Sequence, residues 1–222
     1  MNKQIEAISV FDMLKIGVGP SSSHTLGPWR AAIRFIEKLK TKGNFELIES
    51  LKVDLYGSLS LTGKGHATDV AVIMGLTGAD PTTCSIEDIP TTVEHIKLFR
   101  RLELDGSLTF SFDPEEDIIF NRKFLPFHPN GIRFTATLTN GKKVREVYYS
   151  IGGGFVIQKE RKRAQRKKIA FECFPRPIEK ATELLKFCKQ EGKSISEIIL
   201  ENELYLNTQE EIDERFRQIW DV

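Results

Sequence analysis

The sequence predicts an α/β (α+β) fold, in which helices pack on a mixed sheet and a helical connector follows. Two observations lead to this fold class: apolar residues recur at helical spacing in some segments and alternate with polar residues at strand spacing in others. Both patterns occur within residues 8–158, whereas residues 178–222 show the helical pattern alone. We therefore predict a mixed domain over 8–158, a basic linker over 159–177 and a helical connector over 178–222.

A helix over 29–42 is the first element that the pattern predicts. Its apolar residues recur at helical spacing, Pro28 suits its first turn, and Gly43 suits its end. A strand follows at about 51–55, where apolar and charged residues alternate. A mostly buried helix is then expected over 67–77, because this run is apolar on nearly all sides.

The second half of the mixed domain is expected to contain a hairpin. Before it, the pattern predicts a helix over 92–102 and short strands that break at Pro114. Apolar residues alternate over 131–151, and Asn140 and Gly141 at the centre are typical of a type I′ turn. The sequence therefore predicts two paired strands joined by this turn.

Helix-start patterns recur in the C-terminal segment. Ser194 and Glu197 have the spacing of a capping box, and so do Thr208 and Glu211. These pairs predict two capped helices. The last helix runs to Val222 without a stop signal, so we expect the natural chain to continue beyond it.

The composition excludes several function classes. With 32 Lys and Arg against 31 Asp and Glu, the net charge is +1, so no overall field attracts nucleic acid or an anionic membrane. The cysteines Cys84, Cys173 and Cys188 form neither an even set nor a CxxC pair, which predicts a reducing, cytoplasmic compartment and no metal site in this chain. No apolar run reaches the ~18 residues of a membrane span, and the N-terminus lacks a secretory signal.

The decapeptide 159–168, KERKRAQRKK, contains seven basic residues and one acid. Such a cluster can contact phosphate groups. It lacks the interleaved aromatic side chains that stack on bases, however. We therefore interpret it as a solvated linker and not as a nucleic-acid site.

Three loops rich in glycine and serine are the first candidates for a binding site. They adjoin predicted helices or strands and cover residues 17–27, 57–65 and 152–154. In the first loop, the hydroxyls of Ser21, Ser22 and Ser23 precede a helix N-terminus, whose partial positive charge favours a carboxylate or phosphate. The same hydroxyls equally suit simple capping of that helix. No GK[ST] sequence closes the loop, which argues against an NTP site.

Two of the four histidines, His24 and His66, lie in or directly after the first two of these loops. Imidazole titrates near neutrality and is a common general base, although a loop histidine often serves only as a hydrogen-bonding group. Asp69 has the spacing to orient His66 or to stabilise the first turn of a helix, and Lys64 can pair with a substrate carboxylate or remain solvated. A Ser–His24–Asp69 hydrolase site is a weaker interpretation, because no G-x-S-x-G sequence is present.

Three motifs carry a resemblance to a known family: FDMLKIGVGPSSSHTLGPWRAA, DLYGSLSLTGKGHATDVAVIMGL and YYSIGGGFV. Over residues 9–155 the chain resembles the beta region of the iron–sulfur-dependent L-serine dehydratases, also called L-serine ammonia-lyases. Residues 174–222 are similar to the connector that leads into the catalytic alpha domain of single-chain bacterial members. The resemblance implies a beta domain similar to an allosteric substrate-binding domain.

In that family, L-serine loses water and then ammonia to give pyruvate, without pyridoxal phosphate. A 4Fe-4S cluster acts as a Lewis acid on the substrate, and a base removes the α-proton. The resemblance implies that His66 is this base and that His24 lines the same cleft. It also implies a set of substrate-binding residues: Ser21, Ser22, Ser23, Thr25, Lys64, Thr68 and Asp69.

The cysteines that bind the cluster in this family belong to the alpha domain, and the three cysteines here lack their spacing. The resemblance therefore implies that this chain holds no cluster, is inactive alone, and works with an alpha domain on the same longer chain or on a separate subunit. It also implies a homodimer with L-serine as the small-molecule partner. The alternative is a regulatory module that binds L-serine or a related carboxylate and contributes no catalytic groups.

Overall fold

The computed structural model describes residues 8–158 and 174–222, which form two compact units. One unit consists of residues 17–158 within this range, and the other consists of residues 8–16 together with 174–222. The sequence places residues 8–16 in the mixed domain, but the structure groups them with the C-terminal helices. The basic decapeptide 159–168 lies outside the described residues.

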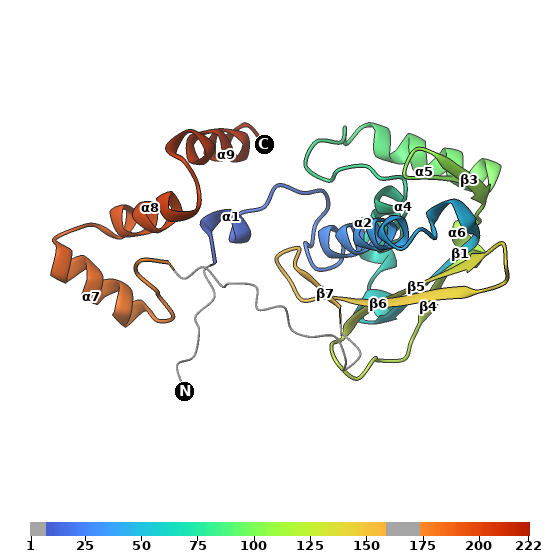
Figure 1. The fold of residues 1–222 in the computed structure, drawn as a ribbon, viewed down its shortest axis with the longest axis horizontal. Coiled ribbons are helices and arrows are strands. Elements are labelled where there is room, and N and C mark those ends of the chain that lie inside the picture. Colours follow the sequence, from blue (N-terminus) through green and yellow to red (C-terminus); the bar gives the residue numbers. More distant parts are fainter. Residues whose placement is uncertain (1–7, 159–173) are drawn as a thin grey trace. The chain divides into compact units, whose positions relative to one another are not determined.

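The larger unit is built on a five-stranded mixed sheet, as the sequence predicts (Figure 1). The strand order is β4-β1-β5-β6-β7, with the bounds Ile48–Gly57 for β1, Ile118–Asn121 for β4, Asn130–Leu138 for β5, Lys143–Ser150 for β6 and Val156–Gln158 for β7. Strand β1 pairs in parallel with β4 and antiparallel with β5, and the other pairs are antiparallel. A separate two-stranded sheet joins β2 (Arg101–Leu104) to β3 (Leu108–Ser111).

Helices α2 (Leu26–Thr41) and α4 (Thr68–Leu76) pack against each other beside the sheet (Figure 1). Helix α5 (Asp88–Phe99) follows α4 and contacts it. Short helical segments connect these elements: η1 (Phe45–Leu47), α3 (Ser58–Leu61), η2 (Lys64–His66) and α6 (Pro114–Asp117). The helices predicted over 29–42 and 67–77 are therefore confirmed, with small shifts at their ends.

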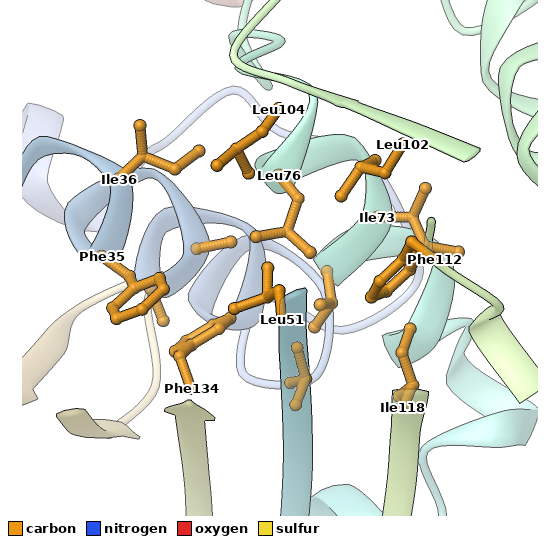
Figure 2. Packing of buried hydrophobic residues seen from close by; sticks show 14 of the residues in the cluster. Phe35, Ile36, Leu51, Ile73, Leu76, Leu102, Leu104, Phe112, Ile118 and Phe134 are labelled. Atoms are coloured by element: carbon orange, nitrogen blue, oxygen red, sulfur yellow. The ribbon is translucent and has the colours of Figure 1, made fainter. Parts of the chain in front are cut away.

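The hydrophobic core lies between these helices and the sheet (Figure 2). Alternate residues of β1 and β5, such as Leu51 and Phe134, point into it because successive side chains of a strand face opposite sides. Phe35 of α2 stacks on Phe134, with the ring centroids 5.0 Å apart. Helices α2 and α4 approach each other closely at Gly75, where a Cβ would lie 2.4 Å from the carbonyl oxygen of Trp29. Only glycine permits this spacing.

The helix predicted over 92–102 is present as α5, although both of its ends lie earlier in the chain. It ends at Phe99 because Arg100 has a φ of 50° and the residues after it form β2. The type I′ turn predicted at Asn140 and Gly141 is wrong. In the β5–β6 connection Gly141 has a φ of 77°, but Asn140 does not adopt a positive φ, which a type I′ turn requires at both positions. The amide of Gly141 donates to the carbonyl of Leu138 at 2.7 Å, so a longer loop with one left-handed glycine joins the strands.

The smaller unit contains the helices α1 (Val10–Met13), α7 (Ala181–Glu191), α8 (Ile195–Leu206) and α9 (Gln209–Asp221). Both predicted capping boxes are confirmed: Ser194 with Glu197 starts α8, and Thr208 with Glu211 starts α9. Among the described helices of the chain, none combines the length and apolar character that crossing a bilayer requires.

A buried carboxylate joins α1 to α8. Glu203 is 2% exposed and accepts hydrogen bonds from Ser9 Oγ and from the Val10 amide, both at 2.7 Å. The ring of Phe11 also packs on Phe216 of α9, with the centroids 4.9 Å apart. These contacts explain why residues near the N-terminus belong to the same unit as the C-terminal helices.

Replacing Gly75 by alanine is expected to lower the free energy of unfolding by about 1 to 3 kcal/mol. The added Cβ would meet the Trp29 carbonyl oxygen at 2.4 Å and the Ala32 Cβ at 2.8 Å, which outweighs the gain of about 1 kcal/mol in helix propensity. Urea unfolding followed by tryptophan fluorescence measures the change. Gly65→Ala is the matched control, because its added Cβ meets nothing within 4 Å. Equal stability of the two variants would contradict the prediction.

Candidate active site

Two turns bring the two candidate histidines together. His24 lies in the loop before α2, and His66 lies in the turn before α4. Their ring centroids are 4.8 Å apart, and the ring planes are inclined at 32°. Ser58 and Thr62, which precede His66 in the chain, also bond to the His24 ring, so the two turns meet at one place. The structure thus places both imidazoles side by side.

His66 is held by a hydrogen bond to the main chain. Its Nδ1 lies 2.9 Å from the carbonyl oxygen of Thr62. A carbonyl oxygen can only accept, so Nδ1 carries the proton. In the neutral ring, Nε2 therefore has the free lone pair, which is what a general base requires.

His24 is held by three side chains. Ser23 Oγ lies 2.9 Å from Nδ1, and Ser58 Oγ and Thr62 Oγ1 each lie 3.1 Å from Nε2. The Thr62 hydroxyl also donates to the carbonyl oxygen of Ser58 at 3.0 Å, so its own oxygen accepts the Nε2 proton of His24. Thr62 therefore contacts both imidazoles, His24 through its hydroxyl and His66 through its carbonyl.

The pKa of His24 lies below its ordinary value of about 6.5. Burial of the ring is the main cause, the neighbouring His66 adds to it, and a hydrogen bond with the main chain at Ser58 acts in the opposite direction. The unfolded chain takes up this proton at higher pH than the folded chain does. Protonation of His24 therefore opposes folding as the pH falls below about 6.5, and at neutral pH the ring is uncharged.

Unusual backbone conformations hold these residues in place. Gly57, at the end of β1, has a φ of 56°, and a Cβ there would lie 2.2 Å from the carbonyl oxygen of Pro129. Ala67, directly after His66, is a non-glycine residue with a φ of 54°. Glycine adopts a positive φ at no steric cost, whereas a positive φ at alanine costs free energy, and such conformations concentrate at functional sites. Gly57 directly precedes Ser58, and Ala67 directly follows His66.

The serine loop does not cap α2 through its hydroxyls, so the capping interpretation is wrong. The N-cap residue Thr25 makes no side-chain cap bond, and its hydroxyl instead donates to the carbonyl oxygen of Ser21 at 2.7 Å. The hydroxyls of Ser21 and Ser23 lie 3.2 Å apart, and Ser22 is exposed. The Ser23 hydroxyl thus bonds to His24, and the loop meets the first turn of α2 through its main chain, where the Ser22 carbonyl accepts from the Gly27 amide at 2.8 Å.

Three further predicted substrate-binding residues lie near His66. Lys64 is exposed, and its Nζ lies 5.5 Å from the centre of the Phe120 ring. Asp69 lies in the first turn of α4, where a carboxylate stabilises the helix N-terminus. It contacts neither imidazole in the described part of the chain, so no Ser–His–Asp hydrolase arrangement forms there. Thr68 is fully buried, and its hydroxyl has no hydrogen-bond partner among the described residues.

Ser58 and Thr62 are site residues that the motifs do not single out. The available signal is their spacing, because Ser58, Thr62 and His66 recur every four residues. Residues with this spacing lie on one side of a helical turn. The sequence indicated a glycine-rich loop at 57–65, whereas the structure forms α3 and η2 there.

The described residues offer no ligand set for an iron–sulfur cluster. Such a cluster needs several cysteine thiolates, whereas Cys84 and Cys188 lie in different units and have free side chains. Cys173 lies outside the described residues. No group of three or more His, Cys, Asp or Glu side chains within 8–158 and 174–222 can hold a metal ion. A cluster therefore does not fit this part of the chain.

Comparison with known proteins gives consistent matches. The family described as serine dehydratase beta chain matches residues 9–161. The chain is 44% identical over 216 residues to L-serine dehydratase TdcG of Escherichia coli (strain K12), and 42% identical over 219 residues to L-serine dehydratase 1 of the same strain. It is 41% identical over 218 residues to an L-serine dehydratase of Streptomyces coelicolor. These alignments cover 96–97% of this chain but 47–48% of each relative, so the chain spans about half the length of the curated relatives it matches.

Nitrogen-15 NMR at neutral pH is expected to show different tautomers for the two rings. His66 should carry its proton at Nδ1, because the Thr62 carbonyl accepts there. His24 should carry its proton at Nε2, because the Thr62 hydroxyl oxygen accepts there. A His66 ring protonated at Nε2 would rule out this network.

His66→Gln is expected to raise the pKa of His24, because it removes the positive charge that helps to lower that pKa. An NMR titration of the His24 ring measures the shift. His95→Gln is the matched control: His95 is exposed on α5, its ring packs on Phe99, and its loss should leave the pKa of His24 unchanged. If His66→Gln also leaves it unchanged, the two rings are not electrostatically linked.

Proposed function

The chain belongs to the serine dehydratase beta chain family, and we propose that it supplies the proton-transfer and substrate-binding groups of an L-serine ammonia-lyase. The proposed reaction converts L-serine to pyruvate and ammonia. Because the chain spans about half the length of its relatives, the activity is proposed for the longer assembly that contains it. The chain alone is proposed to be inactive.

The observation that carries the proposal is the hydrogen bond that fixes the proton of His66. In the elimination, a base takes the α-proton, and the electron pair of the broken Cα–H bond forms the Cα–Cβ double bond. The hydroxyl group leaves Cβ and takes up a proton to form water. The Thr62 carbonyl holds the His66 proton at Nδ1 and leaves Nε2 to accept the α-proton. The resulting aminoacrylate tautomerises to an imine, which water hydrolyses to pyruvate and ammonia.

His24 fits a supporting role beside this base. When His66 takes a proton, its ring becomes positive, and a second positive ring at 4.8 Å would oppose the transfer. The lowered pKa of His24 keeps that ring uncharged at neutral pH. A neutral His24 therefore places no second positive charge beside the ring that accepts the proton.

The substrate-binding role is proposed for polar groups around the two rings. The exposed Ser22 hydroxyl and the Lys64 ammonium suit the substrate carboxylate, because a carboxylate prefers charged and neutral hydrogen-bond donors. The Asp69 carboxylate suits the substrate ammonium group. The remaining residues of the proposed site are Ser21, Ser23, Thr25 and Thr68.

We further propose that the full assembly contains a 4Fe-4S cluster, held by cysteines of an alpha domain outside this chain, and no pyridoxal phosphate. The cluster supplies Lewis-acid chemistry when it is bound. The assembly is proposed to be a cytoplasmic homodimer. Family membership and the greater length of the relatives support these proposals.

His66→Ala is expected to lower kcat for pyruvate formation from L-serine by about 10²- to 10⁴-fold. The assay uses this chain produced with the polypeptide that carries the other half of the enzyme, reconstituted without oxygen with iron and sulfide. The absorbance of the cluster should not change, because His66 is not one of its ligands. His95→Ala on α5 is the matched control and should retain kcat.

Near-normal kcat in the His66→Ala assembly would remove His66 as the base. If kcat is retained while the dependence on L-serine concentration shifts, the alternative of a regulatory module is favoured instead. Cluster assembly and pyruvate formation by this chain alone would contradict the proposed division between two domains.

A further inference from the structure

A second candidate site lies at the other end of α4 from the imidazole pair. A cavity of about 990 Å³ is lined by α5, by the β2–β3 hairpin and by the C-terminal part of α4, including Met74. Its volume is in the range of small-molecule sites. Neither His24 nor His66 lines it, so the cavity is separate from the proposed active site.

Charged side chains of both signs line this cavity. Arg101 and Glu103 alternate along β2 with Leu102 and Leu104, which are fully buried in the core. The alternation places the two charged side chains on the same side of the strand, facing away from the core. Asp88, the first residue of α5, adds a second carboxylate.

These charged groups are available to a ligand. Within residues 8–158 and 174–222, the side chains of Arg101, Glu103 and Asp88 form no hydrogen bond or ion pair with another residue. The cavity therefore offers one guanidinium and two carboxylates to a ligand. This combination is complementary to a small molecule that carries both a carboxylate and an ammonium group.

The cavity also has an apolar wall. Met74 and Ile96 are both 4% exposed, and they line it together with the more exposed ring of Phe99. Apolar walls with a few polar groups are typical of sites that bind small organic ligands. A hydrocarbon or aromatic side chain can bury its surface against these residues.

The backbone around β2 supports the same conclusion. Arg100 and Asp105, which flank this strand, both have a φ of 50°. Within the described residues, the third non-glycine residue with a positive φ is Ala67, next to His66. The amide of Asp105 donates to the carbonyl of Leu76 at 2.9 Å, so contacts with α4 maintain the strained conformation. Such strain is found mostly where the chain positions functional groups.

We propose that this cavity binds a free α-amino acid with a large apolar side chain. Arg101 pairs with the ligand carboxylate, and Glu103 and Asp88 pair with its ammonium group. The apolar side chain of the ligand lies against Met74 and Ile96. This site does not depend on the proposed lyase function, and its test requires no enzyme activity.

Cys84 provides a built-in reporter, because it lines the cavity and is partly buried. Burial raises the pKa of its thiol, so its alkylation is slow and sensitive to access. The full chain is used with Cys173→Ser and Cys188→Ser, which leaves Cys84 as the only thiol. The measurement is the rate of alkylation by N-ethylmaleimide at increasing concentrations of L-phenylalanine.

L-Phenylalanine is expected to slow the alkylation. L-Phenylalaninamide lacks the carboxylate and N-acetyl-L-phenylalanine lacks the ammonium group, so each should need a concentration about tenfold higher or more for equal protection. Arg101→Gln should weaken protection by L-phenylalanine about tenfold but leave that by the amide nearly unchanged. Glu103→Gln should weaken protection by L-phenylalanine, because Glu103 pairs with the ammonium group. It should leave protection by N-acetyl-L-phenylalanine, which lacks that group, nearly unchanged.

Lys97→Gln is the matched control, because Lys97 is exposed on α5 and does not line the cavity. Circular dichroism confirms that each variant is folded, which is expected because Arg101 and Glu103 are exposed. The proposal is overturned if L-phenylalanine gives no protection, or if all three compounds protect equally. It is also overturned if folded Arg101→Gln binds L-phenylalanine as the original chain does.

Discussion

Helix α2 packs on α4 at the distance that Gly75 allows, and this contact organises the larger unit. A Cβ at this position would lie 2.4 Å from the Trp29 carbonyl oxygen, so the two backbones almost touch. Both helices begin directly after a turn that contains a histidine. Fixing the helices therefore also fixes the separation of the His24 and His66 rings. The candidate site is in this sense a consequence of packing in the core.

The environment of the two imidazoles separates their chemical roles. His24 is surrounded by hydroxyl groups, and its lowered pKa makes it a neutral hydrogen-bonding group. His66 donates from Nδ1 to the Thr62 carbonyl in both its neutral and its protonated form. This bond therefore selects the tautomer with a free Nε2 and keeps the ring in one orientation. Thr62 contributes to both environments, which links the two rings.

Local patterns in the sequence predicted the elements whose cause is local. The helices over 29–42 and 67–77 follow from the spacing of apolar residues, and the starts of α8 and α9 follow from hydrogen bonds within one turn. The end of α5 was missed because Arg100 is held in a left-handed conformation partly by the Phe112 amide, which donates to its carbonyl. The tie between α1 and α8 through Glu203 likewise joins distant parts of the chain. No local pattern contains such contacts.

The motifs located both histidines, but they suggested a loop whose open backbone binds an anion, and the structure indicates another reason for the glycines. At Gly57 the chain passes so close to Pro129 that a Cβ would lie 2.2 Å from its carbonyl oxygen. Close approach of two backbone segments is a tertiary property, so residue types alone do not reveal it. The turn that begins there presents Ser58 and then Thr62 to His24. The small residue at the end of β1 is therefore required because it lets the backbone turn tightly enough for hydroxyls to fix an imidazole.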